Sequence, residues 1–436
     1  MVNVLKKIPG IIIMAGLTLL SCPSGFCFHN DEKRDRHEYL DTRLPANMVI
    51  DKDSVDKGLI YINTSFENAS PLNWKVNDEG DIVLNLVYDH QRSSLNRSIS
   101  HLHFQVQARK GSDLTFIIDN HVNIYNGRNG RVSSDRTSLY TSPDGKKWAP
   151  IPTEIVNGNS LKFQVHIEND GLYIAMVEPY RVSDLENLLK EINNHPLVKI
   201  SPLGKTVEGR QLEIIRIGNP DAPYRIFMRG RAHAFEAGGN WLLQGLIRRL
   251  LRNDKDAARY LKRYCVYILP MANKDGVARG KSRFNSLGFD LNREWNKPAD
   301  PVNAPENYAL ETWLEDMIEK GTAPHLVIDF HNDGYGGLHL SRPPHVNVEK
   351  YLARMKRFEA LLRQYTWFTE GSTGPNFKDG GGSIGEGVVE RYGIDGLVYE
   401  LNCVWAAGLN KPPLGADWEL MGEQLTEVFY HYFDGK

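Results

Sequence analysis

Two kinds of hydrophobic pattern divide the chain, and the change between them falls near residue 180. From about residue 49 to residue 177, apolar and polar residues alternate over short runs, a pattern typical of half-buried β-strands. Turn-forming pairs such as Asn126-Gly127 and Asp144-Gly145 separate the runs. The runs that we expect to form strands are 81–88, 103–108, 114–118, 161–166 and 172–177. Repeated short strands without helical segments predict an antiparallel β-sandwich.

After residue 180, strand-like and helix-like segments alternate. Ser183-Asp-Leu-Glu186 predicts a capping box that opens a helix with one apolar face, and His195-Pro196 predicts its end. The further strands that we expect are 212–217, 224–228, 265–269, 326–330 and 397–399. The further helices that we expect are 241–251, 306–320 and 417–433. This alternation predicts an α/β domain with a mixed sheet and helices on both faces.

The first 22 residues have the features of a targeting segment. Lys6 and Lys7 precede a mostly apolar stretch, residues 8–20, which is too short to span a bilayer comfortably. The stretch ends in Leu19-Leu20-Ser21-Cys22, which resembles a bacterial lipoprotein signal, where the cysteine is lipidated and becomes the new N-terminus. Ordinary signal cleavage just after this point is the alternative. Both predict a protein of the bacterial cell envelope, as a periplasmic or outer-membrane lipoprotein, or a secreted one.

A charged stretch follows, and its lack of core-forming residues predicts a solvated tether. The domain arrangement that we expect is a signal segment at 1–22, a charged linker at 23–45, a β-sandwich at 46–180 and a catalytic domain at 181–436. Any membrane attachment is expected only through a lipid anchor at Cys22.

Composition indicates a soluble globular protein without a disulfide framework and gives no sign of nucleic-acid binding. The chain has 436 residues, 41% hydrophobic and 24% charged, and a net charge of −2, which is ordinary for a soluble globular protein of two domains. Nothing in this balance suggests a nucleic-acid partner, which would favour a basic surface. Beyond Cys22 the cysteines are Cys27, Cys265 and Cys403, too few for a disulfide framework. The last two lie in apolar runs and are expected to be buried thiols, although a bond between them stays open.

Four short segments in the second half carry the candidate chemistry. They are His233-Ala-Phe-Glu236, Asp290-Leu-Asn292-Arg293, Asp329-Phe-His331 and Tyr399-Glu400-Leu401. In open α/β sheets, sites form in the crevice beyond the carboxyl ends of the strands. Three of the segments follow or end expected strands, so we expect their polar side chains to meet at one edge of the sheet.

The first and third segments offer a metal site. A zinc ion in a hydrolytic site takes three protein ligands and keeps one position for water. His233 and Glu236 lie three residues apart and can reach one ion from a single turn, but one such pair alone is a weak signal. We prefer His331 as the third ligand because it lies at a strand end. The other histidines that could take its place are His325, His339 and His345.

The other candidate residues are charged or polar groups suited to an anionic substrate and to proton transfer. Arg293 could form a bidentate pair with a carboxylate, with Asn292 donating beside it, or could belong to an ordinary charged turn. Glu400 follows apolar residues, and a carboxylate on a buried strand is rare unless it is paired or functional. Arg283 considered alone would be a solvated charge.

In this order, the residues resemble the zinc metallocarboxypeptidases, the carboxypeptidase A-like family, over roughly residues 184–433. The resemblance is stronger to the cytosolic carboxypeptidase subgroup, which carries a β-sandwich ahead of its catalytic domain. It implies a mixed-sheet α/β/α catalytic domain preceded by an antiparallel β-sandwich. The segments that carry it, besides the four above, are 140–148, 177–180, 271–277, where Lys274 replaces a proline of the family, and 283–293 with its two arginines.

The resemblance implies a zinc-dependent carboxypeptidase that removes C-terminal residues from peptides or proteins. His233, Glu236 and His331 would bind one zinc ion, and Glu400 would act as the general base and then as the acid. The chemistry agrees, because a bound zinc ion lowers the pKa of its water and a base nearby can take the proton.

The same resemblance assigns three residues to the substrate. Arg283 would polarise the scissile carbonyl and stabilise the oxyanion. Asn292 and Arg293 would hold the terminal carboxylate of the substrate. Fixed cations at these positions would meet the negative charge that develops during the reaction.

Two departures from the family concern substrate binding. Relatives with a substrate-capping tyrosine carry it where this chain has Pro375-Asn-Phe-Lys378, and Tyr335 is a candidate replacement. Deglutamylating relatives carry an arginine in a glycine-rich segment where this chain has Glu386. We therefore expect acidic C-terminal residues to be disfavoured, and basic or neutral ones to be accepted.

Two other functions stay open. A zinc amidohydrolase of the same fold, acting on cell-wall peptides or acyl-amino acids, would use similar histidine–glutamate and asparagine–arginine pairs. A protein of a different class, a surface binding lipoprotein with an inactive enzyme domain, would keep the fold without the activity. The long β-sandwich favours the peptidase, and the complete set of polar groups favours an enzyme.

Overall fold

A computed structural model of the chain describes residues 57–92, 95–125, 127–130, 138–342, 347–369 and 382–434. All of them belong to the unit Ile50–Lys436. The expected signal segment, Cys22, Cys27, the charged linker and the segment Pro375–Lys378 lie outside the described residues.

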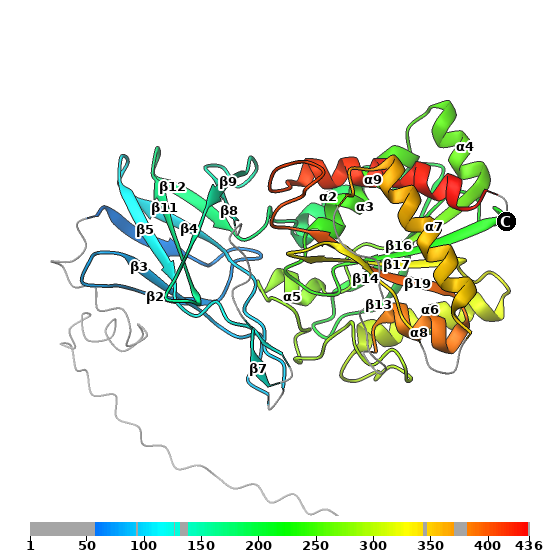
Figure 1. Cartoon of the computed structure of the whole chain (residues 1–436), viewed down its shortest axis with the longest axis horizontal. Coiled ribbons are helices and arrows are strands. Elements are labelled where there is room, and N and C mark those ends of the chain that lie inside the picture. The colour runs from blue at the N-terminus through cyan, green and yellow to red at the C-terminus, as the bar shows by residue number, and fades with distance from the viewer. Residues whose placement is uncertain are drawn as a thin grey trace, which may run out of the picture. The chain divides into compact units, whose positions relative to one another are not determined.

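The first part of the described chain is built from two packed β-sheets (Figure 1). Their strand orders are β1-β4-β12-β8-β9 and β10-β11-β5-β3-β2. The strands are β1 (Leu59–Asn63), β2 (Leu72–Val76), β3 (Ile82–Leu86), β4 (His103–Ala108), β5 (Asp113–Ile118), β8 (Ser138–Ser142), β9 (Ala149–Pro152), β10 (Glu154–Val156), β11 (Ser160–His166) and β12 (Gly171–Ala175). A separate short pair is formed by β6 (Ile124–Tyr125) and β7 (Arg128–Asn129).

The alternating residues of these strands make the sandwich core. In β5, Leu114, Phe116 and Ile118 are buried between the sheets, while the residues between them are more exposed. The five strands expected here all form, with boundaries that differ by no more than a few residues. The antiparallel pairing is confirmed except between β3 and β5, which run parallel.

The second part contains a seven-stranded mixed sheet in the order β13-β14-β16-β15-β17-β19-β18. The strands are β13 (Val198–Lys205), β14 (Gln211–Ile217), β15 (Tyr224–Gly230), β16 (Tyr264–Leu269), β17 (Leu326–Asp333), β18 (Gly337–His339) and β19 (Asp395–Asn402). The central strands β16, β15, β17 and β19 are parallel, and β13, β14 and β18 pair antiparallel at the two margins. Parallel central strands buried on both faces explain the continuous apolar runs of the sequence.

Helices cover both faces of this sheet (Figure 1). They are α2 (Val182–Ile192), α3 (Gly238–Leu250), α4 (Lys255–Arg263), α5 (Lys274–Ala278), α6 (Pro305–Glu319), α7 (Glu349–Tyr365), α8 (Ile384–Tyr392) and α9 (Gly415–Tyr432). One core lies between the sheet and the group containing α3, α7 and α9, and the other between the sheet and α6 with α8. The predicted three-layer arrangement is therefore confirmed.

Two glycines allow α3 and α9 to pack backbone to backbone. A Cβ atom at Gly245 would lie 2.1 Å from the carbonyl oxygen of Glu419, and one at Gly422 would lie 1.9 Å from that of Leu242. Distances this short leave no room for a side chain, so each helix needs glycine at the crossing.

Several local predictions need correction. The N-cap of α2 is Arg181, whose backbone N–H donates to Asp184 Oδ2 at 2.8 Å, so the capping box expected at Ser183 is wrong. The Ser183 hydroxyl instead donates to Glu67 Oε2 in the sandwich. The elements that were not anticipated from the sequence are β1, β2, β6, β7, β8, β9, β10, β13, β18, α4, α5, α7 and α8. Cys265 is buried, Cys403 is only half-buried, and both are free thiols.

The sandwich contacts the α/β part through α5 and the residues that follow it. The backbone N–H of Asn68 donates to Ala278 O at 3.2 Å, and its side-chain amide donates to Val277 O at 2.9 Å. Gly280 has a φ of +62°, and a Cβ atom there would lie 1.9 Å from Ala69 O. Close backbone contact in this conformation requires glycine. Among the helices of the described residues, none is long and apolar enough to cross a membrane.

Candidate active site

Three neighbouring parallel strands bring the candidate chemical groups to one edge of the sheet. His233 follows β15 by three residues, His331 lies near the end of β17, and Glu400 lies near the end of β19. His331 and Glu400 are Cα partners in the β17–β19 register. Because residues in register on parallel strands point to the same side of the sheet, these two side chains leave it together.

The turn that carries His233 is held from behind by a buried arginine. Arg231 has a φ of +61°, which is uncommon for any residue except glycine. Its guanidinium donates to Ala234 O at 2.7 Å and to Asn240 Oδ1 at 3.2 Å. These bonds fix the short turn between β15 and α3, on which both His233 and Glu236 lie.

His233, Glu236 and His331 form a compact group suited to one metal ion. Their ligand atoms all lie within 4.8 Å of one another, and all three residues are buried. His233 Nδ1 lies 2.8 Å from Glu236 Oε1, and His331 Nδ1 lies 2.7 Å from Glu236 Oε2. The two Nδ1 atoms are 3.0 Å apart.

The hydrogen bonds of the two Nε2 atoms determine which imidazole nitrogens are available to a metal ion. His233 Nε2 lies 3.1 Å from Asp290 Oδ1, and His331 Nε2 lies 2.6 Å from Asp329 Oδ2. A carboxylate only accepts, so each Nε2 carries a proton, and the two Nδ1 atoms that face Glu236 are left as the ligand atoms for a metal ion. A bound cation would displace any proton from these Nδ1 atoms and would lie between them and the carboxylate. Carboxylates behind ligand histidines are typical of zinc sites.

The charges in this group are strongly coupled. Burial alone would raise the pKa of Glu236, but the two neighbouring imidazoles outweigh it and lower that pKa to about 2. Burial alone would lower the pKa of His331, but Asp329 and Glu236 raise it well above its ordinary value. The site therefore concentrates negative charge around nitrogen donors, as a divalent cation requires.

A buried ion pair supports the His331 side of the group. Arg229 and Asp329 are fully buried and joined by two hydrogen bonds, of 2.8 Å from Nε to Oδ1 and 2.6 Å from Nη2 to Oδ2. Arg229 also donates to Leu291 O at 3.2 Å and to Asn292 Oδ1 at 3.3 Å. One guanidinium thus connects the carboxylate behind a metal ligand with the segment expected to bind substrate.

Glu400 has the environment of a group that transfers protons. Its Oε2 atom is buried and has no hydrogen-bond partner among the described residues. Burial raises the pKa of Glu400 to about 8, and Glu236 adds to the rise, while His331 opposes it. A carboxyl group that titrates close to neutral pH can take a proton and return it.

Arg283 is held beside the metal group by Asp290. Arg283 Nε donates to Asp290 Oδ2 at 2.7 Å, while the other oxygen of Asp290 faces His233. Burial would lower the pKa of Arg283, but the adjacent Asp290 raises it above its ordinary value, so the guanidinium stays charged. One carboxylate therefore fixes both a candidate metal ligand and a candidate oxyanion-binding cation.

The predicted carboxylate-binding pair lies next to these groups, but its two members differ. Asn292 is buried, and its Oδ1 accepts a hydrogen bond from the backbone N–H of Ile384 at 3.0 Å. Its Nδ2 lies 3.1 Å from His331 Nε2. Arg293 is only partly buried and donates to its neighbour's backbone oxygen at 2.8 Å. Burial is the main cause that lowers the pKa of Arg293.

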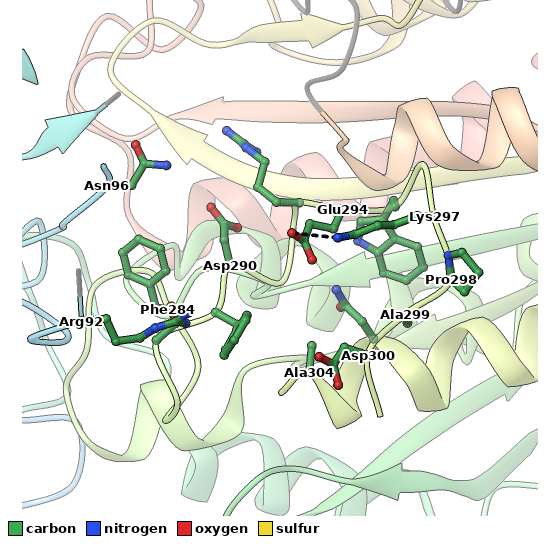
Figure 2. A pocket seen from close by; sticks show the side chains of 15 residues that line it. Arg92, Asn96, Phe284, Asp290, Glu294, Lys297, Pro298, Ala299, Asp300 and Ala304 are labelled. Atoms are coloured by element: carbon green, nitrogen blue, oxygen red, sulfur yellow. Dashed lines mark hydrogen bonds and ion pairs between the residues drawn. The ribbon is translucent and has the colours of Figure 1, made fainter. Parts of the chain in front are cut away.

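A pocket of about 310 Å³ borders this region (Figure 2). Asp290 and Arg293 line it from the catalytic side, and Arg92 and Asn96 line it from the sandwich. Figure 2 labels Arg92, Phe284 and Asp290 among the side chains that line the pocket. The space next to the candidate carboxylate-binding arginine is therefore bounded by both parts of the chain.

The other candidate residues from the sequence are Glu386, Tyr335 and the three alternative histidines. Glu386 lies in the first turn of α8, and its Oε2 accepts a hydrogen bond from the Gly382 N–H at 2.7 Å. Tyr335 is 69% exposed, in the loop between β17 and β18. His325 lies before β17 with its Nδ1 accepting from Arg225 N, and His339 lies in β18. His345 is outside the described residues.

Three residues of the site were given no role by the sequence. Asp329 was visible in its motif, and its position two residues before His331 could have suggested a supporting carboxylate, since alternate residues of a strand share a face. Asp290 was also visible in its motif, but it lies at the start of a turn, where no such alternation applies. Arg229 had no such signal, because a lone arginine in a strand is usually exposed.

Comparison with known proteins supports the same interpretation. Residues 185–331 match the family described as zinc carboxypeptidase. Cytosolic carboxypeptidase 6 of Caenorhabditis elegans is 31% identical over 170 residues, 37% of this chain and 37% of the relative. Cytosolic carboxypeptidase 6 of Mus musculus is 30% identical over 182 residues, 39% of this chain and 33% of the relative. The chain thus covers little more than a third of these relatives' length.

Solved structures confirm the fold over a greater length. A metallo-carboxypeptidase from Burkholderia cenocepacia superposes with a TM-score of 0.75 at 20% identity, covering 86% of this chain and 99% of that one. A metallo-carboxypeptidase from Pseudomonas aeruginosa gives 0.72 at 21% identity, with coverages of 86% and 99%. The resemblance to the zinc metallocarboxypeptidases, and to the cytosolic carboxypeptidases in particular, is confirmed.

Proposed function

We propose that this chain, whose catalytic domain resembles the zinc carboxypeptidases, is a zinc-dependent carboxypeptidase that releases C-terminal residues from peptides or proteins. One observation carries the proposal. The Nδ1 atoms of His233 and His331 and the carboxylate of Glu236 converge on one position, while Glu400 pairs in register with His331 on the adjacent strand. The residues around that position would bind the metal ion, transfer protons and hold the substrate.

The metal ion would be held by His233, Glu236 and His331, with Asp290 and Asp329 orienting the two imidazoles. When bound, zinc lowers the pKa of a water molecule and polarises a carbonyl group. Glu400 Oε2 takes the proton of the attacking water and later gives it to the leaving amine.

The substrate would be held by the cations around the site. The Arg283 guanidinium, kept charged by Asp290, meets the negative charge that develops on the scissile carbonyl oxygen. Arg293 pairs with the terminal carboxylate, and Asn292 lies beside it. Recognition of a free carboxylate next to the scissile bond makes the enzyme an exopeptidase.

The test is hydrolysis of a mixed peptide library by the zinc-loaded protein, with zinc content measured and Glu400→Gln as the control. We expect loss of single C-terminal residues by mass spectrometry, one zinc per chain, and release slowed by at least about 100-fold in the variant. Hydrolysis of acyl-amino acids or cell-wall peptides without C-terminal trimming would favour an amidohydrolase. Zinc binding without hydrolysis of any of these would favour a binding protein.

We further propose that basic or neutral C-terminal residues are preferred over acidic ones. The N-terminus of α8 contacts Asn292 through Ile384 N, and Glu386 lies in that same turn. A carboxylate here disfavours a second carboxylate nearby by like-charge repulsion. Matched peptides ending in Lys, Leu and Glu test this, and faster release of Glu would contradict it.

The cellular location is proposed from residues 1–22 alone. Their charged start, apolar stretch and Cys22 support export to the cell envelope, with a lipid anchor when Cys22 is modified. Fractionation of cells that express the full chain, compared with a Cys22→Ser variant, tests the anchor. Movement of the variant from the membrane to the soluble fraction is the expected result.

A further inference from the structure

The loop that carries Arg283 is held by a carboxylate of the β-sandwich. Asp89 is 7% exposed and accepts hydrogen bonds from successive backbone N–H groups of the loop. Ser282 N donates to Oδ1 at 2.7 Å, Phe284 N donates to Oδ2 at 2.9 Å, and Arg283 N also donates to Oδ2. A buried carboxylate with several amide donors is a strong anchor, because charged acceptors make shorter and stronger hydrogen bonds.

A second set of contacts extends this anchor to the metal group. The hydroxyl of Ser282 accepts a hydrogen bond from the sandwich residue His101 N at 2.9 Å. Ser282 O accepts from Phe235 N, also at 2.9 Å. Phe235 lies between His233 and Glu236, so Ser282 connects the sandwich to the turn that carries two of the candidate metal ligands.

Other sandwich residues hold the same loop further along. Arg92 donates to Gly288 O at 2.9 Å, and its guanidinium lies 3.9 Å from the centre of the Phe289 ring. The ring of His90 packs edge-on against Phe284, with 4.6 Å between ring centres. These contacts all involve residues that follow Arg283 in the sequence, whereas Asp89 binds the backbone of Arg283 itself.

We propose that Asp89 is a positioning residue for Arg283, which makes the β-sandwich a working part of the active site. The inference rests on the proposed function, in which Arg283 stabilises the oxyanion. Electrostatic stabilisation requires a donor fixed where the charge develops, and a misplacement of about 1 Å can cost about 100-fold in rate. The side chain of Arg283 is fixed by Asp290, and its backbone by Asp89.

The first test is Asp89→Asn compared with Asp81→Asn. Asp81 is a matched control because it is a sandwich carboxylate of similar burial, 8% exposed, that pairs with Lys57 and Lys162 within the sandwich. We expect Asp89→Asn to lower kcat by about 10- to 100-fold, with a small change in KM and unchanged zinc content. Asp81→Asn should leave all three nearly unchanged. Equal effects of the two variants would overturn the inference.

The second test asks whether Asp89 acts through Arg283. In a double-mutant cycle, Asp89→Asn should cost far less in an Arg283→Ala background than in the wild-type background, since the group being positioned is already gone. A loss of the same size in both backgrounds would mean that Asp89 only maintains the fold, and would overturn the inference.

A third measurement needs no activity and separates this inference from the proposed function. Amide hydrogen exchange at Ser282, Arg283 and Phe284 should be slow in the wild type and at least about 10-fold faster in Asp89→Asn. If the wild type hydrolyses no peptide, the proposed function fails while the exchange result still decides whether Asp89 fixes the loop. Unchanged exchange would overturn the inference. If Asp89→Asn does not fold, Asp89→Glu, which keeps the charge but moves the carboxylate away from the three backbone donors, replaces it in all three measurements.

Discussion

The candidate site has a sheet half, formed by His233, Glu236, His331 and Glu400, and an interface half, formed by residues 283–293. The two halves are supported in different ways. The metal group and Glu400 are placed by the parallel register of β15, β17 and β19. The segment from Arg283 to Arg293 lies outside the helices and strands. Its beginning, as far as Gly288, is held by hydrogen bonds to the sandwich, some of them between residues more than 190 positions apart, whereas Asn292 near its end is held by Arg229 and Ile384. The sheet therefore places the candidate metal and acid–base groups, whereas contact with the sandwich places the candidate oxyanion-binding residue Arg283.

This difference implies that the two halves can be damaged separately. A change at the sheet edge should alter metal binding or proton transfer and leave substrate contacts intact. A change at the contact with the sandwich should displace Arg283 and leave zinc bound. The expected effects below run from the largest to the smallest.

The largest effect should come from the sheet half, at Glu400. Glu400→Gln keeps the size of the side chain but removes its ability to take a proton, so we expect kcat to fall by about 100- to 10,000-fold. Zinc content and KM should change little, because the ligands and the substrate cations are untouched. Steady-state kinetics with metal analysis checks this. Full activity in the variant would remove Glu400 from the mechanism.

The next effect concerns the carboxylate behind His331. Asp329→Asn removes an acceptor for the imidazole and leaves Arg229 with an incomplete partner, so zinc affinity should fall by about 10- to 100-fold. Unfolding should also become easier by about 3 kcal/mol, because breaking a buried ion pair leaves an uncompensated charge. Competition with a chelator measures the first change, and denaturant unfolding measures the second. Unchanged affinity would show that His331 needs no support.

The interface half is tested by Gly280→Ala, with Gly321→Ala as the control. Both glycines have positive φ, +62° and +68°, but only Gly280 would place a Cβ against the sandwich, 1.9 Å from Ala69 O, while nothing lies within 4 Å at Gly321. We expect Gly280→Ala to lower the free energy of unfolding by about 2 to 4 kcal/mol, against about 1 kcal/mol for the control. Its kcat should also fall, with zinc affinity retained. Equal stability losses would contradict the close contact.

The sequence predicted the sheet half well for a physical reason. Strands with strong apolar runs, such as 326–330, specify their own position, and polar residues at their ends must meet at one edge. The motif spacing of His233 and Glu236 is local, so it too is visible in the chain. The strands of the sandwich were predictable because alternation is a local pattern.

The interface half was not predictable in the same way. The contacts of Asp89 depend on how two parts of the chain pack, and no local pattern marks it among the acidic residues. The cap of α2 was misplaced because Arg181 and Asp184 form the cap in place of the expected serine. The helix α7 was missed although its buried residues Tyr351, Met355, Phe358 and Leu362 recur at helical spacing, so its signal was present in the sequence. The three-residue strand β18 is too short to show a period.

The smallest expected effect is a dependence of stability on pH at the sandwich side of the interface. His101 is buried with Nε2 2.8 Å from Asn68 O, and His103 is buried with Nδ1 3.1 Å from Asn68 Oδ1. Burial lowers the pKa of His101 to about 4 and that of His103 to about 3. Below about pH 6.5 the unfolded chain therefore binds protons that the folded chain does not, so the free energy of unfolding falls as the pH falls.

Between pH 7 and pH 5, His101 alone should account for a loss of about 2 kcal/mol. His101→Gln can keep a donor toward Asn68 O but does not titrate, so its stability should fall less over this range than that of the wild type. His166→Gln is the control, since His166 is 56% exposed and pairs with Asp113 on the sandwich surface. Denaturant unfolding at pH 7 and pH 5 measures the three proteins. A wild-type loss that exceeds the His101→Gln loss would show that protonation of the His101 ring destabilises the protein, whereas equal losses would assign the acid sensitivity to other groups.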